Sequence, residues 1–206
     1  MMGSRYLKRL RRANEGATAV EFALIAMPLS VLLLGGLDLG HQVWTRSQLQ
    51  GALLDSARRA AVEDPAFTAS GSNLEERIRN TVKAQVDPIA PNGSYTITIS
   101  NFYEFSGIGN PEKIVTDKNG NGEYDDSDGD CFEDLNDNGS YDLDAGRSGV
   151  GGANDVVFYE ATVEVPRLLP MTSLLGWSDK MSLSASAAIR NQPYANQAQP
   201  AVICGS

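Results

Sequence analysis

The chain has 206 residues, 42% of them hydrophobic, and a net charge of −9. That length suffices for a membrane helix and one domain of ordinary size. The acidic total, with no basic patch interleaved with aromatic residues, argues against nucleic-acid binding. With one histidine there is no Ser-His-Asp set, and no phosphate-binding loop is present, so we do not expect an enzyme.

A long apolar stretch, Gly16–Leu39, follows a basic N-terminus. As a helix rising 1.5 Å per residue, it would cover about 30 Å, the hydrocarbon thickness of a bilayer. One acidic residue, Glu15, and five basic residues precede it: Arg5, Lys8, Arg9, Arg11 and Arg12. This charge bias predicts a cytoplasmic N-terminus, a single pass through the inner (cytoplasmic) membrane, and a C-terminal domain outside the cytoplasm.

Glu21 is the only charged residue from Ala17 to Leu37, and a plain membrane anchor does not explain it. A carboxylate within an apolar span is costly and usually has a partner, although near the cytoplasmic end it can also reach the lipid headgroups. A secretory signal peptide does not fit, because the apolar run is too long and no small-x-small cleavage site ends it.

The run EGATAVEFAL, from Glu15 to Leu24, resembles the processing site of type IV prepilins. More narrowly, it resembles the TadE/TadG-like proteins of tight-adherence (Tad) pili. The Gly-x-x-Asp-x-Gly pattern at Gly35–Gly40 and the run LLDSARRA that ends at Ala60 are similar to that family too. The strong resemblance covers about the first sixty residues.

This resemblance implies that a prepilin peptidase cuts between Gly16 and Ala17, and that Glu21 then takes part in subunit assembly. It implies a pseudopilin or minor pilin, whose partners are the peptidase, other pilins, pilus-assembly proteins and membrane lipid. It also implies a pilin-like fold and association with a pilus used in cell adhesion. The alternative is an uncleaved, single-pass binding or assembly module of the same pilus system.

The predicted organisation has three parts. Residues 1–16 form a cytoplasmic leader, residues 17–63 a helix that spans the membrane to about residue 39, and residues 64–206 an extracytoplasmic domain. In that domain we expect a helix that begins at Asn73 and stops before Pro88. We expect an apolar helical turn at Leu168–Gly176, and strands at Tyr95–Phe105, Val156–Val165 and Met181–Arg190. The fold class is therefore α+β, with an antiparallel sheet packed on the long helix.

The segment Asp117–Asp144 holds eleven acidic residues and one lysine, and it contains two calcium-type loops within residues 117–145. Each has oxygen-bearing side chains at positions one, three and five and a glycine at position six, the pattern of EF-hand-like loops. The predicted ligands of the first are Asp117, Asn119, Asn121, Glu123, Asp125 and Asp128. Those of the second are Asp134, Asn136, Asn138, Ser140, Asp142 and Asp144, where Asp144 substitutes for Ala145 at position twelve. Asp126, Asp128 and Asp130 offer a third, overlapping set.

We expect one or two calcium ions in these loops. The alternative is a solvated, disordered acidic loop, which is common for acidic runs. The two cysteines, Cys131 and Cys204, would lie outside the cytoplasm, where a disulfide can form. Sequence alone does not give their separation, so a disulfide and two free thiols both stay open.

Overall fold

The computed structural model describes residues 15–169 and 176–205. Most of the predicted leader and most of the predicted turn at Leu168–Gly176 lie outside these residues. Chain contacts divide the protein into two compact units. The first, which we call the helix unit, contains residues 1–43 and Arg167–Asp179. The second, the domain unit, contains Trp44–Pro166 and Lys180–Ser206.

A single helix, α2 (Glu15–Ala60), confirms the predicted long N-terminal helix, with Pro28 inside it. From Thr18 onward it is long and apolar enough to cross a membrane, judged by length and composition. Large apolar side chains are exposed along its N-terminal half: Val20, Phe22, Leu24, Ile25, Met27, Leu29, Leu32, Leu33, Leu34, Leu37 and Leu39. The C-terminal half instead buries one stripe, Leu49, Leu53, Ala57 and Ala60, in the domain unit.

The second helix, α3 (Leu74–Val86), begins at the predicted cap, where Asn73 Oδ1 accepts the Glu76 N–H at 2.8 Å. In a capping box, the Glu76 carboxylate would accept the N–H of the cap residue Asn73. Here it accepts the N–H and the hydroxyl of the preceding residue, Ser72, both at 2.6 Å. These two hydrogen bonds lower the pKa of Glu76. The apolar face of α3 is buried as its spacing predicts, through Ile78, Val82 and Val86.

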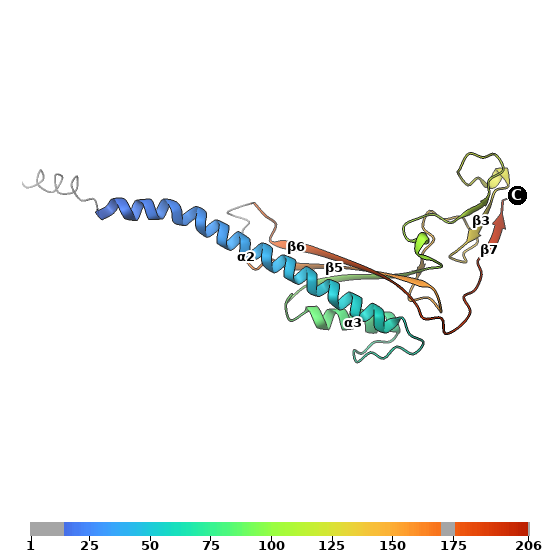
Figure 1. Ribbon diagram of the computed structural model, residues 1–206, viewed down its shortest axis with the longest axis horizontal. Helices are drawn as coiled ribbons and strands as arrows, with labels where there is room; N and C mark the ends of the chain where they lie inside the picture. Colours follow the sequence, from blue (N-terminus) through green and yellow to red (C-terminus); the bar gives the residue numbers. More distant parts are fainter. Residues whose placement is uncertain (1–14, 170–175, 206) are drawn as a thin grey trace, which may run out of the picture. The chain divides into compact units, whose positions relative to one another are not determined.

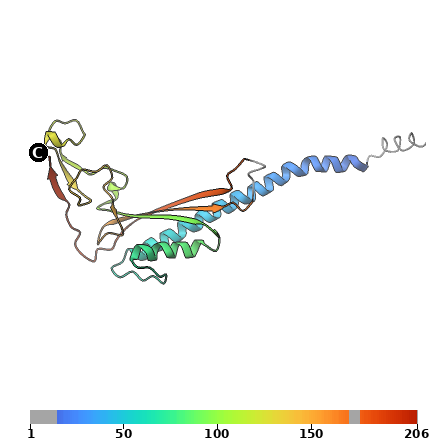
Figure 2. The same ribbon diagram turned by 180° about the vertical axis from the view of Figure 1, so that it is seen from behind.

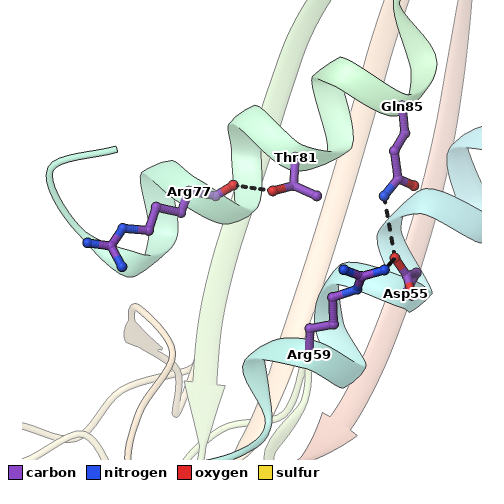
Figure 3. A network of polar contacts seen from close by, with 5 residues as sticks. All are labelled: Asp55, Arg59, Arg77, Thr81 and Gln85. Carbon is purple, nitrogen blue, oxygen red and sulfur yellow. Dashed lines mark hydrogen bonds and ion pairs between the residues drawn. The ribbon is translucent and has the colours of Figure 1, made fainter. Parts of the chain in front are cut away.

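In the domain unit, α3 lies beside the C-terminal half of α2 in both views (Figure 1 and Figure 2). Figure 3 shows the polar edge of this pair, where Gln85 Nε2 donates to Asp55 Oδ2 at 3.4 Å and Arg59 pairs with the same carboxylate at 3.0 Å. Within α3, the Thr81 hydroxyl donates to the Arg77 carbonyl at 2.7 Å. These contacts are solvent-exposed, so the buried apolar stripes hold the helices together.

The main sheet is antiparallel, with strand order β4-β1-β5-β6. Its strands are β1 (Ser94–Phe102), β4 (Arg147–Ser148), β5 (Val156–Pro166) and β6 (Lys180–Arg190). The three long strands match the predicted ones, except that β1 ends at Phe102, where a short 3-10 helix, Phe105–Gly107, follows. In β6 the predicted alternation is confirmed: Met181, Leu183, Ala185 and Ala187 are buried, and Ile189 is half-buried.

A second, smaller sheet was not predicted as a sheet. It contains β2 (Ile114–Thr116), β3 (Cys131–Asp134) and β7 (Ala201–Cys204) in the order β2-β3-β7. Near the C-terminus, β7 pairs with β3 from Cys131↔Cys204 to Asp134↔Ala201. The C-terminus follows β7 directly (Figure 1 and Figure 2). This sheet anchors the acidic segment, because β3 lies between the two calcium-type loops.

Candidate functional site

Two regions of the described chain carry the predicted functional residues. The first is the start of α2, where Gly16 and Glu21 are exposed. Among the residues that the structure describes, Glu21 makes no ion pair, while apolar side chains around it, such as Phe22 and Leu24, are also exposed. In a membrane, this carboxylate would therefore need a partner from outside the described chain.

Further along α2 lies a buried ion pair that sequence reasoning missed. The Asp38 side chain is fully buried, and its Oδ2 accepts a hydrogen bond from Arg167 Nη1 at 2.6 Å. Asp38 Oδ1 is buried and has no hydrogen-bond partner among the residues that the structure describes. The pairing joins residues 129 positions apart, so only the arrangement of the folded chain reveals it.

The second region is the acidic segment Asp117–Asp144, and its first loop closes on its own side chains. Asp117 accepts the N–H groups of Gly120 at 2.7 Å and Gly122 at 2.8 Å. Asn119 Oδ1 and Asn121 Oδ1 accept the backbone N–H groups two residues on, those of Asn121 and Glu123. The turn requires a left-handed backbone at Gly122, whose φ is 81°, a conformation that glycine adopts without strain.

The second loop repeats this conformation. Asp134 Oδ2 accepts the Gly139 N–H at 2.8 Å, and Gly139 again has a φ of 81°. Asn136 and Asn138 accept from backbone N–H groups two residues on, those of Asn138 and Ser140, like their counterparts in the first loop. The sequence repeat is therefore a repeat of backbone geometry, which a featureless acidic run does not have.

The two loops differ in the carboxylate that accepts hydrogen bonds from their asparagine side chains. In the first loop the Asn119 amide donates to the carboxylate of Asp128, at position twelve. In the second loop the Asn136 and Asn138 amides donate to Asp142, at position nine, at 2.7 and 2.6 Å. Asp144, predicted to substitute at position twelve, accepts the Gly146 N–H instead, and Ala145 is buried.

Three aromatic rings join the loops. Tyr124 and Tyr141, at position eight of their loops, stack at 4.6 Å between ring centroids. Phe132, in β3, meets both rings edge-on, at 5.0 and 5.5 Å. In addition, Cys131 and Cys204 form a disulfide across β3 and β7. The equal spacing of the tyrosines from the loop glycines was visible in the sequence, and it is the signal that could have predicted their stacking.

Two buried carboxylates that were not predicted as anchors hold the loops in place. Glu112, before β2, accepts the N–H groups of Leu135 at 2.7 Å and Asp142 at 3.1 Å, which fixes both sides of the second loop. Asp130, assigned above to the overlapping ligand set, accepts the N–H groups of Lys118 at 2.9 Å and Asp125 at 3.1 Å. No local pattern in the sequence distinguishes Glu112, because its partners lie more than twenty residues away.

The pKa shifts of three loop carboxylates and of the anchor Glu112 have opposite directions. Hydrogen bonds from the Gly122 N–H and other backbone groups lower the pKa of Asp117, and the Asn136 and Asn138 amides lower that of Asp142. The Ser127 hydroxyl and N–H do the same for Asp125. Burial raises the pKa of Glu112. Asp117, Asp125 and Asp142 are therefore ionised at neutral pH, where they present negative charge to a cation.

The donor set of both loops is all oxygen, from carboxylates, amides and backbone carbonyls, which suits a hard cation such as calcium. Within residues 15–169 and 176–205, no three His, Cys, Asp or Glu side chains converge as a metal-binding group. Side-chain amides of the loops instead donate hydrogen bonds to the carboxylates, as Asn119 does to Asp128. For calcium to bind, these amide N–H groups would have to release the carboxylates, so that carboxylate and amide oxygens could coordinate the ion instead.

Residues 16–58 match the family model of TadE-like proteins. The match confirms the resemblance to TadE/TadG-like proteins over this part of the chain, which includes Gly16, Glu21 and Asp38. It supports an involvement in Tad pilus assembly and leaves the acidic segment outside the matched residues. No curated protein and no solved structure matches the chain.

Proposed function

We propose that this chain, whose N-terminal helix matches the TadE-like family, is a pseudopilin or minor pilin of a Tad-type pilus. In this proposal a prepilin peptidase removes residues 1–16, and Ala17 becomes the mature N-terminus. One observation carries the proposal: within the matched residues, the part of α2 from Thr18 to Leu37 exposes large apolar side chains and holds a single carboxylate, Glu21. Such a surface suits lipid before assembly and neighbouring helices within a filament.

The proposed role is structural and not enzymatic. The chain would insert once into the inner membrane with the domain unit outside the cytoplasm, and its partners would be other pilins, assembly proteins, the peptidase and lipid. The disulfide between Cys131 and Cys204 supports this orientation, because disulfides form in oxidising compartments. An uncleaved, membrane-anchored assembly module of the same system is the competing function.

The role proposed for Glu21 follows from the charge that cleavage creates. A new N-terminus at Ala17 would carry an ammonium in an apolar setting, and a buried charge without a partner is unfavourable. Glu21 lies four residues further on, about one helical turn. Its carboxylate would offset that ammonium, in its own subunit or in a neighbour.

Glu21→Ala should therefore leave membrane insertion and cleavage intact but lower incorporation into pili at least about tenfold, since breaking a buried pair costs several kcal/mol. Immunoblots of membrane and sheared pilus fractions measure both steps. Glu63→Ala, which removes an exposed acid beyond α2, is the matched control. Normal incorporation of Glu21→Ala would remove this role for the carboxylate.

We further propose that the acidic segment binds one or two calcium ions outside the cytoplasm. Support comes from the repeated loop geometry, the left-handed glycines at position six, and an all-oxygen donor set. The eleven acidic residues of the segment repel one another, and coordination to a calcium ion would offset this repulsion. The ligands would come from the residues predicted above, with Asp144 excluded unless it leaves its contact with Gly146.

A further inference from the structure

We propose that a polar cavity in the domain unit binds a neutral sugar ring. The cavity has a volume of about 240 Å³ and lies between the end of β1, the strand β4, the loop before β5 and tail residues 196–198. It is smaller than the roughly 300–1,000 Å³ of pockets that hold drug-sized molecules, so it fits a ligand the size of one ring. The polar side chains of its wall are Asn101, Tyr103, Arg147, Asp155, Asn196 and Gln197. The inference goes beyond the proposed pilus function and does not depend on it.

Hydrogen bonds between residues of the wall hold the cavity in shape. The Gln197 amide donates to the Tyr103 carbonyl at 2.9 Å and to Asp155 Oδ1 at 2.8 Å, which fixes the tail beside the main sheet. The Asn101 side chain, which is buried, donates to the Gly149 carbonyl at 3.0 Å. Because the protein's own contacts define these walls, little ordering is needed when a ligand binds, and this lowers the entropic cost of binding.

The charges of the wall favour a neutral ligand. Of the described residues that line the cavity, Arg147 and Asp155 are charged, with opposite signs. An anion would meet the Asp155 carboxylate and a cation the Arg147 guanidinium, so a neutral molecule avoids both repulsions. A zwitterion would also balance them, but Arg147 already donates from Nε and Nη2 to the Leu135 carbonyl. That edge of the guanidinium is therefore not available to grip a carboxylate through two hydrogen bonds.

The hydrogen-bonding groups of the wall match the hydroxyl groups of a sugar. Asp155 Oδ2 accepts the Gly152 N–H at 2.7 Å, and a carboxylate oxygen has a second lone pair for another donor. The Asn196 amide carries both donors and an acceptor, and the Tyr103 hydroxyl carries one donor together with acceptor lone pairs. A sugar hydroxyl also donates and accepts, so a ring of hydroxyl groups can use both kinds of group at once.

Titration of the full chain with monosaccharides tests this inference. The chain is kept in a phosphocholine detergent, because a detergent with a sugar headgroup would compete for the cavity. Glucose, galactose, mannose and N-acetylglucosamine are the probes, and at least one should bind saturably in saturation-transfer NMR. Ala198→Phe enlarges an exposed residue that lines the cavity, and it should weaken this binding at least about tenfold. Ala195→Phe, the same change at an exposed tail residue outside the lining, is the matched control and should bind like the unaltered chain.

Asn196→Ala provides a second variant that leaves the bonds of Gln197 in place. It should weaken binding by about two- to tenfold, the effect of losing one or two hydrogen bonds. Circular dichroism shows whether each variant keeps its fold. No saturable binding of any of the four sugars would overturn the inference. Binding that neither variant weakens would do the same, because the sugar would then lie elsewhere. Tighter binding of glycine or of glucuronate than of every neutral sugar would show a site for amino acids or anions and would also overturn it.

Discussion

Calcium at 10 mM should raise the free energy of unfolding of the acidic segment by about 1.4–2.7 kcal/mol per occupied site. This range follows from mass action with dissociation constants of about 10⁻³ to 10⁻⁴ M, typical of extracellular calcium modules. The gain arises because the acidic residues of Asp117–Asp144 repel one another without a cation. A bound ion also holds Gly122 and Gly139 in the turn that they already adopt.

The measurement is thermal and chemical unfolding of the chain in detergent, with calcium, magnesium or chelator, together with amide exchange in Asp117–Asp144. Asp117→Ala combined with Asp134→Ala should abolish the calcium-dependent gain. Glu63→Ala combined with Asp64→Ala removes the same charge from an exposed site outside the segment and should keep the gain. Equal stability and equal exchange in all three solutions would leave a solvated acidic loop with no calcium function.

Replacing both cysteines, as Cys131→Ser with Cys204→Ser, should lower the free energy of unfolding by about 4 kcal/mol. The disulfide spans 73 residues, and the loop-closure model of its effect on the unfolded chain gives this magnitude. The loss should concentrate in the small sheet, because β7 has four residues and, within the described part of the chain, pairs with β3 alone. Between β5 and β6, by contrast, eleven residue pairs and a buried apolar face hold the main sheet.

Denaturant unfolding of the oxidised chain, the reduced chain and the double variant measures this effect. The reduced chain and the variant should unfold at the same lower denaturant concentration, and amide exchange should accelerate first in β7 and β3. Reductant should leave the variant unchanged, which serves as the control. An oxidised chain no more stable than the variant would show that packing of Phe132 and β3, and not the disulfide, holds the small sheet.

The sequence predicted the main fold because its signals are local and strong. The apolar run from Ala17, the Asn73 cap and the alternation in Met181–Arg190 each specify an element without information from the remainder of the chain. Helix α2 and strands β5 and β6 therefore appeared close to their observed bounds. The small sheet lacked such signals, because β7 has only four residues and its partner β3 lies inside an acidic run.

For the candidate sites, the sequence predicted the loop conformation better than the contacts that hold it. The position-six glycines and the repeated Asp-x-Asn-x-Asn spacing anticipated two turns of the same geometry. The loop anchor Glu112 and the ion pair of Asp38 could not be foreseen, because each depends on a partner that is distant in sequence. The cleavage site, the role of Glu21 and the calcium ligands remain predictions.

The mass of the mature protein in assembled pili from its native host tests the pseudopilin function most directly. Intact-mass and N-terminal peptide spectra should show a chain that begins at Ala17 and lacks the first sixteen residues. The membrane fraction of a host without prepilin peptidase should retain the full leader. A chain that still begins at Met1 in assembled pili would contradict processing after Gly16 and favour the uncleaved, membrane-anchored module.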